Sequence, residues 1–311
     1  MPDVAVHAAF GNEVLSSLPP AVRDSLVQEP YRFALFGPDL WFMYRPWQRR
    51  EGRGRRMHTT RTGDFLLALV RRLGVSACPA ELFSYLSGFL CHYALDSLTH
   101  PYIVYVTTKE HFFPRSHMSL EHALDALEMQ RDGLWGSSHP ITGHYYPSMR
   151  LPDCLREDLD AVFEDTYGWK NCWKALNASC RRYRACYRIM EHPRGLAARF
   201  TRLTKIPVFR SLVYSESHFH DLDPENTAHR PWFNPFDPSR RSSESFPELR
   251  EKARRRAVDL IVAVWNFARL GRGTEETLAA LIGSDSYLSG LPWDDPRNGG
   301  VSSLLPPGRK E

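Results

Sequence analysis

The sequence lacks the patterns that mark several common protein classes. Its 311 residues contain no C-x-x-C pair, no internal repeat and no glycine-rich period. The six cysteines are too few for a disulfide scaffold in a chain of this length, so we expect free thiols. The N-terminal stretch has neither the basic segment nor the apolar core of a signal peptide. These absences predict a cytoplasmic protein in a reducing compartment.

Charge and composition exclude further classes. The net charge is only +4, which is too small to indicate nucleic acid as the main partner. Aromatic residues make up 12% of the chain, which excludes intrinsic disorder over its whole length. A chain of 311 residues is long enough for one large domain or two modest ones with a substantial core.

One stretch imitates a membrane-spanning helix. Between residues 82 and 108 the only formally charged side chain is that of Asp96. However, His92, His100 and Pro101 fall in the same run, and ionisable groups at the centre of a bilayer are costly. The run is therefore predicted to be a buried helix whose polar side chains have a function.

Apolar residues recur at intervals of three and four along most of the chain, which predicts an all-α fold, a multi-helix bundle with long loops. The predicted helical segments are 8–18, 63–73, 80–99, 117–131, 153–165, 171–190, 247–270 and 274–283. A short strand-like run is found at 102–107. Residues 45–56, which include six arginines, and residues 221–246 are predicted to be loops.

Histidines and carboxylates recur at helical spacing in two segments. His92, Asp96 and His100 are four residues apart, so on a helix they project from one face. Because that helix is otherwise apolar, the three groups must be paired with one another or bound to metal. His117 and Glu121 repeat the spacing. One such pair is often a helix salt bridge, but two pairs this close predict a metal site, and zinc suits imidazole and carboxylate ligands.

With these pairs the chain resembles the zinc-dependent phospholipase C family, which shares its fold with the fungal zinc nucleases. The resemblance rests on a series of histidines and acidic residues within residues 1–130, in the order H…D…H…HxxxD…H…HxxxE. The series consists of His7, Asp39, His58, His92, Asp96, His100, His117 and Glu121.

The resemblance implies how these side chains share two or three zinc ions. The implied ligand groups are Asp39, His58, His92 and Asp96 for one zinc, His100, His117 and Glu121 for a second, and His7 with a bridging Asp96 for a third. In the secreted members an N-terminal tryptophan completes the third site, whereas this sequence begins with Met1. The gap between Asp96 and His100 is also shorter than in those enzymes.

The resemblance further implies a zinc-dependent hydrolase of phosphate esters, with phospholipase C-type cleavage of a phospholipid headgroup as the leading expectation. Metal ions a few ångström apart hold the ester and activate water. Asp39 is also the candidate catalytic base. Asp64 and Asp125 are candidates to accept a hydrogen bond from a ligating histidine, and each is equally a helix cap or a surface charge.

Other functions stay open at this point. One alternative is a zinc-dependent nuclease or small-molecule phosphodiesterase, and another is a non-catalytic helical binding protein stabilised by metal. Expected partners are a phospholipid or another phosphodiester, with peripheral membrane contact, and nucleic acid is less favoured. The Arg-rich loop 45–56 is either a solvated loop or a gate that attracts anionic phosphate or an acidic membrane surface.

The chain is predicted to form a single all-α metallohydrolase domain over residues 1–290. The metal-ligand motifs occupy residues 1–130, and additional helices occupy residues 150–290. The segment 291–311 is predicted to be a loosely ordered C-terminal tail.

Overall fold

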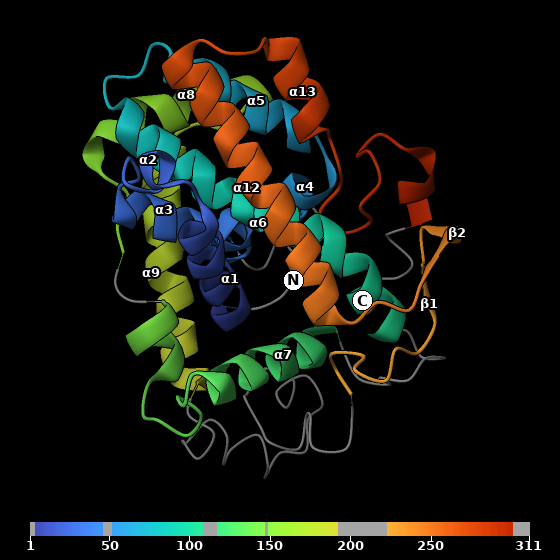
Figure 1. The fold of residues 1–311 in the computed structure, drawn as a ribbon. Coiled ribbons are helices and arrows are strands. Elements are labelled where there is room, and N and C mark those ends of the chain that lie inside the picture. Colours follow the sequence, from blue (N-terminus) through green and yellow to red (C-terminus); the bar gives the residue numbers. More distant parts are fainter. Residues whose placement is uncertain (1–3, 46–51, 108–116, 147–148, 192–222, 301–311) are drawn as a thin grey trace, which may run out of the picture.

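The computed structural model describes residues 4–45, 52–107, 117–146, 149–191 and 223–300, which are mostly helical (Figure 1). The first half contains α1 (Val4–Ser17), α2 (Pro20–Arg23), α3 (Gln28–Ala34), the 3-10 helix η1 (Gly37–Met43), α4 (Arg53–Thr59), α5 (Thr62–Leu73), α6 (Pro79–Thr107) and α7 (His117–Arg131). The second half contains η2 (Ile141–Tyr145), η3 (Asp153–Leu155), α8 (Arg156–Tyr167), α9 (Cys172–Met190), β1 (Trp232–Asn234), β2 (Asp237–Ser242), α12 (Phe246–Leu270), α13 (Glu275–Ile282) and η5 (Pro296–Gly300). The all-α prediction is confirmed.

The long helix α6 is the centre of the fold. Nearly all of its side chains are buried, because α1, α3, α5, α7, α12 and η1 pack around it (Figure 1). Gly88 permits the close approach of α3, since a Cβ at that position would collide with the backbone oxygen of Tyr31. The predicted buried helix is thus confirmed as far as Thr107. Among the residues that the structure describes, no helix has the length and hydrophobicity to cross a bilayer.

The helix α12 lies across α6, and its ends follow from local sequence. Ser245 and Glu248 form a capping box, in which each side chain accepts a hydrogen bond from the backbone N–H of the other residue. Gly271 ends the helix with a φ of 60°, a conformation that glycine adopts without strain. The buried side of α12 includes Leu260 and Ile261. It packs against α6, the helix that carries His92, Asp96 and His100.

Three short elements differ from the sequence prediction. The strand-like run 102–107 forms the last turns of α6, because it is covered on every side rather than on one face. In the predicted Arg-rich loop, residues 53–56 begin α4, whereas residues 46–51 lie outside the described part of the chain. In the other predicted loop, β1 and β2 form an antiparallel hairpin with Trp232 opposite Ser242.

The domain division at residue 290 stays a prediction. In the tail, Leu291 is buried beside the hairpin and the end of α6. The N–H of Trp293 donates a hydrogen bond to the backbone oxygen of Ser284, and Arg297 forms an ion pair with Asp237 of β2. Residues 301–311 lie outside the described residues.

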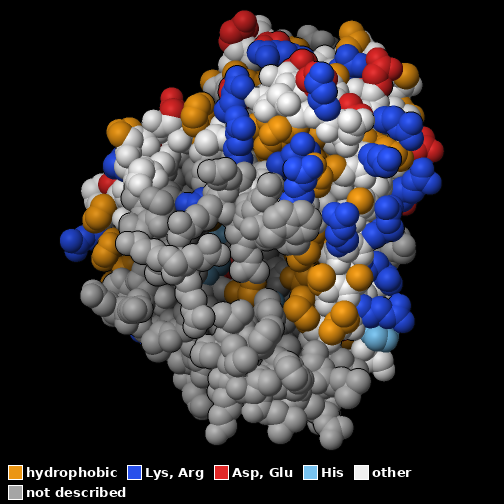
Figure 2. Space-filling view, turned by 180° about the vertical axis from the view of Figure 1, so that it is seen from behind, with side chains coloured by type: hydrophobic (Ala, Val, Ile, Leu, Met, Phe, Trp, Pro, Cys, Tyr) orange, Lys and Arg blue, Asp and Glu red, His pale blue; other side chains and the backbone are white. Residues whose placement is uncertain are grey.

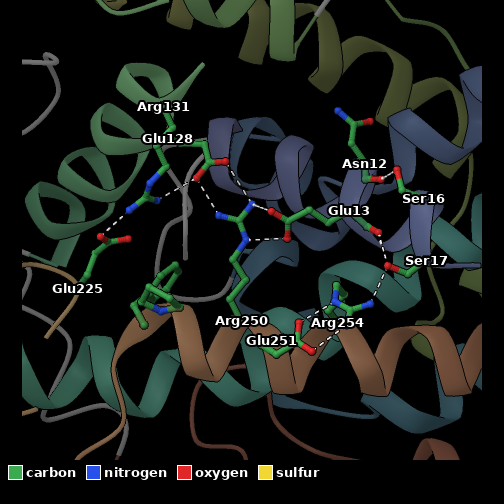
Figure 3. A pocket seen from close by; sticks show the side chains of 12 residues that line it. Asn12, Glu13, Ser16, Ser17, Glu128, Arg131, Glu225, Arg250, Glu251 and Arg254 are labelled. Atoms are coloured by element: carbon green, nitrogen blue, oxygen red, sulfur yellow. Dashed lines mark hydrogen bonds and ion pairs between the residues drawn. The ribbon is translucent and has the colours of Figure 1, made fainter. Parts of the chain in front are cut away.

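A cleft of about 810 Å³ lies between α1, α7 and α12 (Figure 3). Arg250 of α12 projects into it and pairs with Glu13 of α1 at 2.9 Å and with Glu128 of α7 at 2.7 Å. Burial opposes the charge of Arg250, but these two carboxylates raise its pKa above the ordinary value. The lining of the cleft includes none of the predicted metal ligands, so Arg250 serves to hold three helices together.

Candidate metal centre

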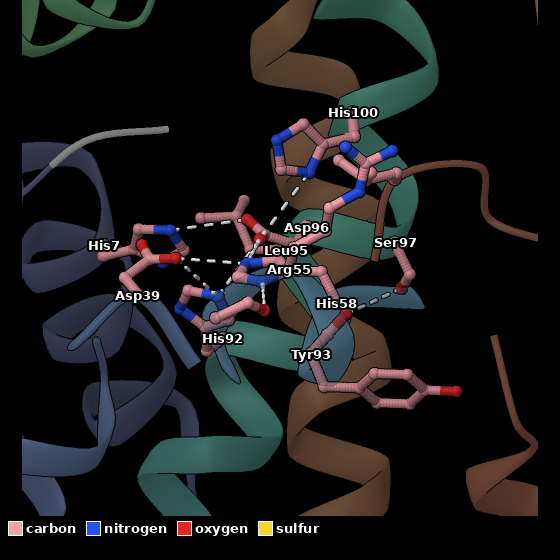
Figure 4. A network of polar contacts seen from close by, with 12 residues as sticks. His7, Asp39, Arg55, His58, His92, Tyr93, Leu95, Asp96, Ser97 and His100 are labelled. Carbon is pink, nitrogen blue, oxygen red and sulfur yellow. Dashed lines mark hydrogen bonds and ion pairs between the residues drawn. The ribbon is translucent and has the colours of Figure 1, made fainter. Parts of the chain in front are cut away.

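The eight predicted ligands lie side by side in the interior. They come from five segments: His7 from α1, Asp39 from η1, His58 from α4, His92, Asp96 and His100 from α6, and His117 and Glu121 from α7. All of them are buried except His117, whose side chain is 25% exposed. Folding therefore collects donors that are far apart in the chain, and Figure 4 shows most of them converging on Asp96.

Asp39, His58 and His92 form one donor group. Nε2 of His58 lies 3.1 Å from Oδ1 of Asp39, and Nε2 of His92 lies 3.9 Å from the same oxygen. Ligands that share one zinc lie roughly 3–4 Å apart, so these separations fit a common ion. Burial opposes protonation of His92, but the carboxylates of Asp96 and Asp39 raise its pKa overall.

Asp96 lies between the donor groups. Its Oδ1 is 3.3 Å from Nε2 of His7, and its Oδ2 is 3.0 Å from Nε2 of His92 (Figure 4). The rings of His7 and His92 stack with centroids 4.1 Å apart, which aims both nitrogens at the same carboxylate. Oδ2 of Asp96 is also 3.6 Å from Nδ1 of His100. Nε2 of His58 lies 3.9 Å from the same oxygen, so one carboxylate is within reach of four imidazoles.

His100, His117 and Glu121 form a further donor group. Oε1 of Glu121 lies 2.9 Å from Nε2 of His117 and 3.8 Å from Nε2 of His100. The two rings are nearly parallel, with an interplanar angle of 6° and centroids 5.5 Å apart. The four-residue spacing thus places His117 and Glu121 side by side on one face of α7, as the sequence predicts for two ligands of one metal ion.

The chemistry of these donors fits zinc. Within the described residues, atoms without a hydrogen-bond partner include Nε2 of His7, Nε2 of His92, both oxygens of Asp96 and both ring nitrogens of His100. Burying such atoms unsatisfied is costly, so a cation between them is favoured. Burial lowers the pKa of His7, His100 and His117, which keeps their rings neutral. Burial acts against ionisation of Asp96, but His92 and His100 hold its pKa well below the ordinary value. Neutral imidazole and ionised carboxylate are the forms that bind metal.

The segment that contains these donors also matches a known protein family. The model of the zinc-dependent phospholipase C family matches residues 6–187. The chain belongs to the zinc-dependent phospholipase C family. It is accordingly a zinc-dependent phosphoric ester hydrolase, and its several buried His and Asp clusters are consistent with more than one zinc site. The matched region contains the whole donor series, whereas the hairpin and α12 lie beyond it. No curated protein and no solved structure matches the chain.

In this phospholipase C family member, backbone carbonyls orient two of the histidines. Nδ1 of His58 lies 2.6 Å from the oxygen of Gly54, and Nδ1 of His92 lies 3.0 Å from the oxygen of Leu35. Each contact directs the opposite nitrogen, Nε2, toward the carboxylates. The ring of Tyr287 also packs against both histidines, with centroids 5.4 Å and 5.7 Å away. The sequence does not reveal these contacts, because every residue has a backbone carbonyl and Tyr287 lies far from both histidines along the chain.

The two aspartates considered as supporting residues have different positions. Asp125 is fully buried, and its carboxylate accepts hydrogen bonds from the N–H groups of Ala5 and Val6 at 3.0 Å and 2.9 Å. It thereby fixes the first turn of α1, the helix that carries His7. The exposed carboxylate of Asp64 pairs with Arg61 at 3.2 Å, which fits the surface-charge interpretation.

Near the metal centre of this phospholipase C family member, three aromatic rings surround the guanidinium group of Arg53. The guanidinium carbon of Arg53 lies 4.3 Å from the ring centroid of Tyr44, 4.7 Å from that of Trp169 and 4.9 Å from that of Trp41. Such cages bind cations through the faces of their rings. Because Arg53 is in α4, this contact also holds the helix that carries His58.

Proposed function

We propose that this protein cleaves the phosphate ester of a phospholipid headgroup in the manner of a phospholipase C, with the eight histidines and carboxylates of the centre as its zinc ligands. The position of Asp96 carries the proposal. Its oxygens lie 3.3 Å from His7, 3.0 Å from His92 and 3.6 Å from His100, so it borders every donor group. A carboxylate shared in this way suits metal ions that act together on one phosphate.

Each carboxylate then has a distinct role in the reaction. When bound, zinc supplies a Lewis acid for the phosphate oxygens and lowers the pKa of water to about 7. Oδ1 of Asp39 faces His58 at 3.1 Å and is the proposed ligand atom. Its other oxygen, Oδ2, is proposed to hold the proton that the attacking water loses, as a general base. Asp96 keeps its charge throughout, because His92 and His100 stabilise the ionised form.

Arg55 is proposed to hold the substrate phosphate. It lies one turn before His58 on α4, so both project from the same side of that helix. Figure 4 shows the Arg55 side chain extending toward His100. Within the described parts of the chain, Arg55 has no ion pair with a carboxylate. An unpaired guanidinium near the proposed zinc ligands would favour an anion, and phosphate oxygens match its forked geometry.

Peripheral membrane contact is proposed through α9. This helix presents exposed side chains at Arg181, Arg182, Arg188 and Ile189, and Ile189 is 66% exposed. Figure 2 shows basic side chains gathered along this side of the molecule. Basic residues beside an exposed apolar one suit the headgroup region of an anionic bilayer. Cytoplasmic location stays a prediction from the sequence.

A combined measurement of metal content and product tests the proposal. Protein purified without chelator is analysed for zinc by mass spectrometry and incubated with phospholipid vesicles that contain or lack anionic lipid. We expect more than one zinc per chain and release of diacylglycerol, both reduced in His92→Ala and retained in Asp64→Ala. Phosphatidic acid as the product would contradict cleavage on the diacylglycerol side. Hydrolysis of an oligonucleotide alone would favour a nuclease, and zinc without any hydrolysis would indicate a binding protein.

A further inference from the structure

A separate group of potential metal ligands lies at the start of α6. Sγ of Cys78, Sγ of Cys154 and a carboxylate oxygen of Glu81 are all within 4.8 Å of one another. Cys78 immediately precedes α6, Glu81 is in its first turn, and Cys154 is in η3, which leads into α8. The centre described above uses only nitrogen and oxygen donors, so these two sulfur atoms form a chemically different site.

Polar contacts hold the two cysteine segments together. The N–H of Cys78 donates a hydrogen bond to the hydroxyl of Ser76 at 3.1 Å, and that hydroxyl donates to Asp158 of α8. Arg72 of α5 donates to the other oxygen of Asp158 at 2.6 Å. The turn before α6 is therefore fastened to the first turn of α8, next to Cys154. The hydroxyl of Ser76 also lies 4.0 Å from Sγ of Cys78, so the network that fastens the turn also positions this thiol.

The donor set favours a thiophilic ion. Two thiolates and a carboxylate suit zinc, and cadmium binds the same sulfur ligands. Glu81 has no ion pair with a basic residue in the part of the chain that the structure describes. Cys154 is exposed, so an ion can enter from solvent, whereas Cys78 is only 8% exposed and closes the inner side. The site is thus accessible from outside and enclosed from within.

The thiol of Cys78 has to lose its proton before it can bind a metal ion. Burial, together with the neighbouring thiol of Cys154, raises the pKa of Cys78 to about 12. A thiol with so high a pKa is protonated at neutral pH. A coordinating metal ion, by contrast, removes the proton from the thiol that binds it.

We propose that Cys78, Glu81 and Cys154 bind one zinc ion that is separate from the catalytic centre. Binding forms two Zn–S bonds and one Zn–O bond and releases the two thiol protons to solvent, with no change of oxidation state. His92 lies about 20 Å farther along α6, so this ion takes no part in hydrolysis. It joins the start of α6 to η3 and thereby fixes the helix that carries three of the catalytic donors.

Titration of the full chain with Cd²⁺ tests the site, because thiolate-to-cadmium charge transfer gives an ultraviolet band that histidine and carboxylate ligands do not. We expect one such band per chain that saturates at one equivalent. It is lost in Cys154→Ser, and Glu81→Gln weakens the affinity at least about tenfold, as loss of a metal-site partner does. The matched control Cys186→Ser keeps the band, since Cys186 belongs to no ligand group of the described residues.

A second measurement uses the wild-type chain, so its result does not depend on whether a variant folds. In the wild-type chain, Zn²⁺ is expected to protect Cys78 and Cys154 from alkylation, as mass spectrometry of the peptides would show. Absence of the cadmium band, its persistence in Cys154→Ser, or a Cys78–Cys154 disulfide in protein isolated with reductant would overturn the proposal. The band is expected to persist in His92→Ala, so the outcome does not depend on hydrolytic activity.

Discussion

Gly37 lies directly against the imidazole of His92. A Cβ at Gly37 would stand 2.6 Å from Cγ of His92, and the residue has a φ of +40°. The absence of a side chain therefore lets η1 approach α6 closely at this point. Because Asp39 follows two residues later, the same approach brings its carboxylate to the ring nitrogens of His58 and His92.

Gly37→Ala should misplace His92. The methyl group would collide with the ring, and the left-handed backbone would add roughly 1–2 kcal/mol of strain. A displacement of about 1 Å at a reacting centre can cost about 100-fold in rate, so we expect a loss of that order in kcat/KM together with a lower zinc content. Gly168→Ala is the matched control, since Gly168 also has a positive φ, +73°, but a Cβ there would meet no atom within 4 Å. Equal activity losses in the two variants would show that strain alone matters.

Asp96→Asn should affect all donor groups at once. The amide keeps the size of the side chain but removes the charge and one acceptor, so it cannot serve His7, His92 and His100 together. Loss of a residue that only supports a metal ligand already costs about 10–100-fold in affinity or activity, and Asp96 is itself a proposed ligand. We therefore expect a loss of more than about 100-fold in kcat/KM and less than half of the wild-type zinc. Mass spectrometry and initial rates would measure both, and a full zinc content would contradict a shared role for Asp96.

Asp125→Ala should act on the position of His7. Removing the carboxylate leaves the N–H groups of Ala5 and Val6 without this acceptor, and hydrogen bonds to a charged group contribute about 1.5–3 kcal/mol. We expect a loss of stability of that size in urea unfolding and weaker binding of the zinc that involves His7. Asp125→Asn, which retains an acceptor oxygen, should recover part of the stability. If both variants bind zinc normally, Asp125 serves stability alone.

Arg55→Ala should weaken binding of substrate and of inorganic phosphate. Loss of a charge-assisted hydrogen bond of about 1.5–3 kcal/mol corresponds to roughly 10–100-fold in affinity. We expect that change in KM and in the phosphate dissociation constant from calorimetry, with zinc content unchanged. Arg56→Ala is the neighbouring control, because Arg56 is exposed on the same helix. Arg55→Lys should retain part of the binding as a point charge. Unchanged phosphate affinity in Arg55→Ala would remove Arg55 from the site.

Several features of the fold could be predicted from the sequence because they depend on periodicity. The long helices α6, α7 and α12 each repeat apolar residues over many turns, so their existence follows from spacing, as do the ends of α7 and α12. The end of α6 does not, because it continues to Thr107 through the run 102–107 that looked strand-like. The pairs His92–Asp96 and His117–Glu121 have the same helical basis. Their position in one cluster required the family resemblance as well, because spacing alone does not bring α1 or η1 to α6.

Other features have no periodic signal. The helices α2 and α4 contain only four and seven residues, too few to establish an amphipathic pattern. The carbonyls of Gly54 and Leu35 act through the backbone, so residue type does not reveal them. Cys78 and Cys154 lie close together only because α5, α6 and α8 pack together. They are far apart in the chain and form no C-x-x-C motif, so spacing does not predict the pair.

The chain order of the catalytic donors has a consequence for synthesis. His7, Asp39, His58, His92 and Asp96 all precede α7, whereas α12, which covers α6, begins at Phe246. A ribosome therefore releases the donors of two metal groups long before it makes the helix that encloses them, and domains begin to fold from the N-terminal side. Zinc bound at that stage would hold α1, α4 and α6 together before α12 is made.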